Sequence, residues 1–162
     1  MKKGTLSILS AVLGMTVGIV GTKTIEAKVV DKDTNKYKEL SEKHFVILKL
    51  FNQWMITKQE GKSIVNYLHN ENIKTVAIYG MSYVGERLYN ELKGSDIEVK
   101  YAIDKNADAI YSELEIITPE DILEEVDAVL VTAVFYFDHI EDVLSEKMMC
   151  PILSLEDILY NL

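Results

Sequence analysis

The chain has little cysteine, histidine or proline: its 162 residues include one Cys, three His and two Pro. The single Cys150 excludes an internal disulfide framework and fits a reducing compartment. One Cys and three scattered His give no metal-ligand spacing, so we expect no metal site. The net charge is −9, with no basic stripe on the predicted globular part, so we expect no nucleic acid partner.

Charged residues are also absent from Thr5 to Thr22, a run rich in Leu, Ile, Val and Gly. As a helix it would extend about 27 Å, close to the thickness of a bilayer's hydrocarbon core. We therefore predict a transmembrane anchor within residues 1–22, with residues 5–22 in the membrane. The alternative is a cleaved signal peptide, because Lys2 and Lys3 precede the run, but a good A-x-A cleavage site is missing.

Lysines flank this run unevenly, with two before it and several soon after it, beginning at Lys23. The positive-inside rule counts these lysines and largely ignores neighbouring acids. It predicts a single-pass membrane protein whose carboxyl-terminal domain lies in the cytoplasm, where a nucleotide ligand would also be found.

Residues 23–60 are predicted to be a helical connector and a possible coiled coil. Asp31 to Gln59 contains no Pro and no Gly, and a stripe recurs at alternating spacings of three and four: Tyr37, Leu40, His44, Ile47, Phe51, Trp54 and Lys58. Two or three heptads do not specify a coiled coil. The stripe either packs on the chain's own globular domain or forms a parallel homodimer, continuous with the GxxxG motif of Gly14 and Gly18.

Residues 61–162 are predicted to form a Rossmann-like nucleotide-binding domain. An apolar run ending at Tyr79 is followed by a glycine turn, Gly80 to Gly85, and then by a helix-period pattern to Leu92. The next alternating run ends on Asp104. That is roughly 20 residues past the turn, where a dinucleotide-binding βαβ unit carries its ribose-binding acid.

The glycine turn departs from the usual fingerprint at one position. Gly80 permits the bend and Gly85 permits close packing of helix on strand, but Ser82 replaces the usual second glycine. Amide groups at this helix start would face an anion. The ligand is therefore left open between NAD(P), a single phosphate and a nucleotide-sugar.

We predict ten ligand-binding residues around this turn and the ends of the second and fourth strands. Asp104 favours an unphosphorylated ribose, whereas the adjacent Lys105 leaves NAD against NADP open. In the alternative interpretation, Asp104 is a solvated turn acid. The full predicted set is Gly80, Met81, Ser82, Tyr83, Val84, Gly85, Asp104, Lys105, Thr132 and Ala133.

The remaining elements complete a parallel sheet. We predict an α/β fold with strand order 3-2-1-4-5 and the ligand crevice between the first and fourth strands. Phe135 or Tyr136 either stacks on a base there or belongs to the core. The predicted elements are a strand over 114–117, a helix over 118–125, a strand over 127–133, a helix over 138–147, a strand over 150–153 and a closing helix from Ser154.

Four stretches together resemble a known group: 78–80, Gly85, 101–104 and 127–133. They are similar to the compact Rossmann domains of bacterial sugar-modifying and surface-polysaccharide proteins. These include the domain before sialic-acid-type O-acetyltransferases and the carboxyl-terminal domain of sugar C-methyltransferases. The resemblance covers about residues 74–162. It implies nucleotide or nucleotide-sugar binding at Gly80, Ser82, Gly85 and Asp104, whereas the transferase chemistries reside in other domains.

Three functions follow as hypotheses. The first is a membrane-tethered nucleotide or nucleotide-sugar binding module, accessory or regulatory in bacterial envelope glycan or polysaccharide biosynthesis. The second is a small NAD(P)-dependent oxidoreductase or epimerase acting as a dimer. The third is a non-catalytic dimerisation protein whose crevice is filled by side chains such as Met81 or Tyr83. No Ser-His-Asp, Cys-His or Tyr-x-x-x-Lys arrangement suggests itself, so whether the protein is an enzyme stays open.

Overall fold

The computed structural model describes residues 34–162 of the chain. The predicted membrane anchor, the motif of Gly14 and Gly18 and the first part of the connector lie outside these residues. The chain divides into two units, Met1–Phe45 and Val46–Leu162. In the first unit, residues 34–45 are helical and carry a close ion pair one turn apart, with 2.6 Å between Lys43 Nζ and Glu39 Oε1. Within residues 34–162, no helix is long and apolar enough to cross a membrane.

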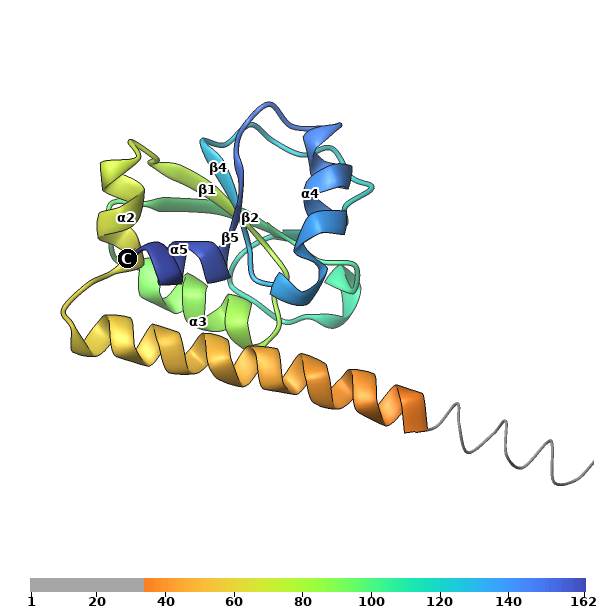
Figure 1. The fold of residues 1–162 in the computed structure, drawn as a ribbon. Helices are drawn as coiled ribbons and strands as arrows, with labels where there is room; N and C mark the ends of the chain where they lie inside the picture. The colour runs from red at the N-terminus through yellow and green to blue at the C-terminus, as the bar shows by residue number, and fades with distance from the viewer. Residues whose placement is uncertain (1–33) are drawn as a thin grey trace, which may run out of the picture. The chain divides into compact units, whose positions relative to one another are not determined.

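The second unit is built on a five-stranded sheet in which every pairing is parallel and the strand order is β3-β2-β1-β4-β5 (Figure 1). Both the α/β class and the predicted order are confirmed. Because β4 lies on the opposite side of β1 from β2, the strand order reverses between β1 and β4. The strands are β1 (Thr75–Tyr79), β2 (Glu98–Ile103), β3 (Ile116–Ile117), β4 (Ala128–Val131) and β5 (Ile152–Ser154).

Helices cover both faces of this sheet. The face that receives Val76 and Ile78 of β1 is packed by α2, α3, α5 and residues 46–59 of the connecting helix, whereas Ala77 and Tyr79 face α4 on the other side. This alternation follows from the two-residue period of a strand, and burial on both sides explains the continuous apolar run. The helices are α2 (Ile64–Asn70), α3 (Tyr83–Leu92), α4 (Phe137–Ser145) and α5 (Leu155–Asn161).

The helix predicted over 118–125 is wrong. Hydrogen bonds typical of a helix start are present: Asp121 Oδ2 accepts one from the backbone N–H of Thr118 at 2.7 Å and one from the Thr118 hydroxyl at 2.9 Å. The segment nevertheless forms a single turn and then runs irregularly into β4. A short helix needs a packed apolar face to offset its costly nucleation, and Ile122, central to the predicted helix, is 94% exposed.

Two 3₁₀ turns lie between the strands and helices of the second unit. The first, η1, is formed by Ala107–Ala109. The predicted strand over 127–133 ends at Val131, and Val134–Tyr136 forms a second 3₁₀ turn, η2, that leads directly into α4. This early ending frees the residues after β4 to turn toward the crevice.

The connecting helix continues to residue 59 and packs on the domain through Leu50 and Trp54, which are buried. Of the two alternatives given for the stripe, packing on the chain's own domain is what the structure has at Trp54. Leu48 and Met55 lie outside this contact and are 63% and 60% exposed. The homodimer stays a prediction.

A buried carboxylate holds this helix in place, and the sequence analysis had missed it. Glu91 of α3 accepts a hydrogen bond from the Trp54 indole N–H at 2.7 Å and from the backbone N–H of Ile64 at 3.3 Å. Lys58 Nζ lies 2.5 Å from the Glu91 carboxylate, whose side chain is only 9% exposed. One carboxylate therefore joins the connecting helix, α2 and α3.

We expect Glu91→Ala to lower the free energy of unfolding by about 2 kcal/mol, because the Trp54 and Ile64 donors lose their buried acceptor. Trp54 is the only tryptophan in the chain, so its fluorescence during urea unfolding reports on this contact directly. Asn90→Ala, at the neighbouring exposed position of the same helix, is the control and should change stability by no more than about 0.5 kcal/mol. Equal effects of the two substitutions would contradict the role given to Glu91.

Candidate functional site

A crevice of about 510 Å³ opens at the carboxyl-terminal edge of the sheet, where the strand order reverses between β1 and β4. This is the edge at which open parallel sheets bind ligands, and the volume lies within the range of small-molecule sites. Its walls come from the ends of β1 and β2, the segment after β4 and the start of α4. The lining residues are Tyr79, Gly80, Asp104, Lys105, Asn106, Ala133, Tyr136, His139 and Ile140.

The glycine turn can form only with glycine at its two ends. Gly80 has a φ of +94°, a conformation that side-chain-bearing residues rarely adopt, and a Cβ there would lie 2.9 Å from Thr132 Oγ1. A Cβ on Gly85 would lie 2.1 Å from the Gly80 carbonyl oxygen. Helix α3 therefore rests directly on the turn, as the sequence analysis expected of Gly85.

The first turn of α3 faces this bend with amides that the helix itself does not use. The helix begins at Tyr83, three residues before the apolar pattern indicated, and its N-cap Ser82 makes no side-chain capping hydrogen bond. The first N–H groups of a helix have no intrahelical acceptor. They are available to an anion, and the helix dipole favours negative charge there.

Thr132 holds the bend from the β4 side. It is 4% exposed, and its Oγ1 donates a hydrogen bond to the Gly80 carbonyl oxygen at 2.6 Å, with the Tyr79 carbonyl oxygen a second acceptor within reach at 3.1 Å. Its backbone N–H also donates to the Tyr79 carbonyl at 2.9 Å. Thr132 thus positions the turn and is not among the residues that line the crevice, whereas the adjacent Ala133 is.

Asp104 holds the bend from the β2 side and also lines the crevice. Its Oδ2 accepts a hydrogen bond from the Met81 backbone N–H, and its Oδ1 accepts one from the Asn106 backbone N–H, both at 2.9 Å. A carboxylate has about four acceptor sites, so two bonds leave capacity for ligand hydroxyls. Asp104 therefore both lines the crevice and has the turn-acid role that had been its alternative.

The other predicted residues separate into buried and exposed positions. Met81 and Val84 are 3% and 2% exposed and belong to the hydrophobic core, so their backbone alone can face a ligand. Ser82 and Tyr83 are exposed, Tyr83 at 81%, and neither fills the crevice. Lys105 lines the crevice, as Asp104 does.

Five lining residues were absent from the predicted set of ten: Tyr79, Asn106, Tyr136, His139 and Ile140, of which Tyr136 had been named only as a possible stacking residue. Burial, with smaller contributions from Asp104 and Glu120, raises the pKa of Tyr79, so its hydroxyl stays protonated and can donate. His139 is exposed and stands on the first turn of α4, which η2 directs toward the crevice, and no local sequence pattern reveals that direction.

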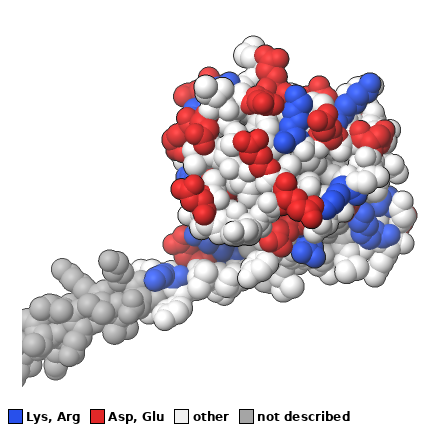
Figure 2. Space-filling model, turned by 180° about the vertical axis from the view of Figure 1, so that it is seen from behind, with Lys and Arg blue, Asp and Glu red and all other residues white. Residues whose placement is uncertain are grey.

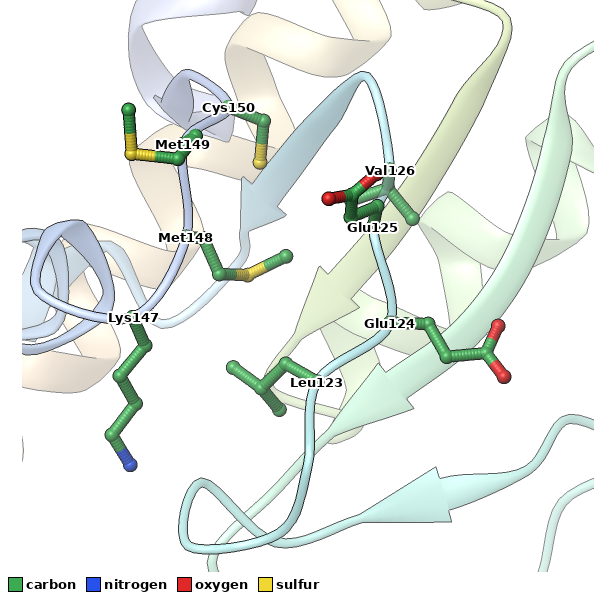
Figure 3. Close-up of a pocket in the computed structure, with 8 residues that line it drawn as sticks. All are labelled: Leu123, Glu124, Glu125, Val126, Lys147, Met148, Met149 and Cys150. Carbon is green, nitrogen blue, oxygen red and sulfur yellow. The ribbon is translucent and has the colours of Figure 1, made fainter.

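A second cavity, of about 290 Å³, lies at the opposite edge of the sheet, before β4 and β5 (Figure 3). Leu123, Met148 and Cys150 contribute apolar and sulfur-bearing side chains to it. Burial raises the pKa of the Cys150 thiol, which makes it a poor nucleophile at neutral pH. No glycine is among the residues that line this cavity.

Carboxylates are spread over the face of the globular unit seen in Figure 2, with lysine and arginine side chains among them. Within residues 34–162, no group of three or more His, Cys, Asp or Glu side chains is placed to hold a metal ion.

The sheet order and the crevice at its switch point define a Rossmann-like α/β domain. In comparisons with known proteins, residues 72–151 match a family model described as C2185-like, N-terminal. The matched stretch contains the glycine turn, Asp104 and β4. No curated protein and no solved structure matches the chain.

We expect Gly85→Ala to destabilise the protein by about 3 kcal/mol, because the new methyl group cannot fit against the Gly80 carbonyl and α3 must move. Gly61→Ala is the matched comparison: Gly61 has a φ of +73°, and a Cβ added there would meet nothing within 4 Å, so only backbone strain of about 1 kcal/mol results. Urea unfolding measures both. A Gly85→Ala variant as stable as Gly61→Ala would show that α3 does not rest on the turn.

Proposed function

We propose that this protein is a membrane-tethered module that binds a nucleotide or nucleotide-sugar in the crevice between β1 and β4. The observation that carries this proposal is the joint presence of Gly80 and Asp104 on the wall of a cavity at the sheet's switch point. In the proposed complex, the first-turn amides of α3 bind the phosphate and the Asp104 carboxylate accepts hydrogen bonds from the ribose hydroxyls.

The open crevice favours this function over a purely structural role. A domain that had lost its ligand would be expected to fill the space with side chains. Here Met81 packs into the core and Tyr83 points into solvent, so the volume beside Gly80 is left accessible.

The tether and the biological setting rest on other observations. The apolar run of residues 5–22 supports a membrane anchor with the domain on the cytoplasmic side. The resemblance of residues 74–162 to domains of sugar-modifying proteins supports an accessory or regulatory place in bacterial envelope glycan assembly. A homodimer formed through the anchor and the connecting helix is part of the same proposal.

A thermal-shift screen of the full-length chain against NAD(H), NADP(H) and UDP-sugars tests the binding function. A ligand at 100 times its Kd should stabilise the folded state by about 2.7 kcal/mol and raise the Tm. No rise with any of these ligands would contradict the proposal.

Two matched variants test whether the rise in Tm comes from binding in the crevice. Asp104→Asn should reduce the ligand-induced rise in Tm. Asp108→Asn, at an exposed position in η1, should leave that rise unchanged. The Tm without ligand is measured first for each variant, because Asp104 also accepts the Met81 amide.

A further inference from the structure

The two sides of the crevice differ in chemistry. The side formed by the end of β2 carries the charged residues Asp104 and Lys105. The side formed by the segment after β4 carries Ala133, Tyr136, His139 and Ile140, with no carboxylate, lysine or arginine among its lining residues. A ligand that spans the crevice therefore meets a charged wall at one end and an aromatic, mainly apolar wall at the other.

Tyr136 is the aromatic residue that the η2 turn presents to the crevice. It is 48% exposed, and its neighbour Phe135, which is 43% exposed, is not a lining residue. The two rings meet edge to face, with centroids 5.3 Å apart and planes at 81°. Two adjacent aromatic side chains of similar exposure thus differ in whether they reach the ligand space.

His139 adds hydrogen-bonding capacity next to this ring. It follows Tyr136, the N-cap of α4, by three residues, and both side chains line the crevice. An imidazole offers a donor or an acceptor at each ring nitrogen. Tyr136 thus offers a ring face for packing, and His139 offers polar atoms beside it. Together they suit a ligand ring that is uncharged and carries hydroxyl or amide groups.

Building on the proposed function, we infer that the Tyr136 side of the crevice binds an uncharged ring joined to the distal phosphate of the nucleotide, either directly or through a ribose. Tyr136 is then a specificity-determining residue, because its ring packs against that group and distinguishes ligands that carry it from ligands that lack it. Such a ring occurs as the sugar of a nucleotide-sugar or as the dihydronicotinamide of NADH.

Isothermal titration of the full-length protein with two ligand pairs tests this inference: UDP with UDP-glucose, and ADP-ribose with NADH. In at least one pair, the ligand with the additional ring should bind about three- to tenfold more tightly, the range expected of an aromatic contact. The pair that shows the difference identifies which of the two sources supplies the ring.

Three variants test whether Tyr136 causes the difference in affinity between the two ligands of a pair. Tyr136→Ala should abolish this difference in affinity while changing the affinity for UDP or ADP-ribose less than twofold. Phe135→Ala, the matched neighbour, should preserve it, and Tyr136→Phe, which keeps the ring and guards against misfolding of the alanine variant, should also preserve it.

The outcomes separate the two proposals. If UDP or ADP-ribose binds but the additional ring adds no affinity, or if Tyr136→Ala leaves the difference intact, this inference is wrong and nucleotide binding stands. An equal loss for both members of a pair in Tyr136→Ala also overturns it. If none of the four ligands binds, the proposed function fails and this inference fails with it.

Discussion

The structure depends on one close approach, between the start of α3 and the carbonyl of Gly80. There is no room for a methyl group at Gly85, where a Cβ would lie 2.1 Å from that oxygen. The same carbonyl accepts the Thr132 hydroxyl at 2.6 Å, so β1, β4 and α3 are fixed together at a single atom. The first helical turn, whose amides have no intrahelical acceptor, is therefore held against Gly80, which lines the crevice.

Asp104 couples this bend to the second strand. Its carboxylate accepts the Met81 amide and the Asn106 amide and still borders the ligand space. The residue that would recognise a ribose is thus held by the turn that would recognise a phosphate, so both groups are preorganised with respect to each other. Glu91 performs a comparable role on the other end of α3, where it joins that helix to Trp54 and to α2.

Much of the fold could be predicted because its patterns are local. The apolar runs and the turn at Gly80 define strands and helices from short stretches of sequence. The helix expected after Thr118 failed because local capping contacts formed without a surface to pack against. Predicting His139 and Ile140 at the site requires knowing how η2 and α4 turn after β4, which depends on tertiary packing.

Nuclear magnetic resonance of the ¹⁵N-labelled protein during titration with UDP or ADP tests the central claim most directly. The account predicts that the largest amide shifts fall in residues 82–85 at the start of α3, because their N–H groups receive the phosphate. Binding that shifts the amides around the cavity of Leu123 and Cys150, and leaves residues 82–85 unchanged, would contradict it.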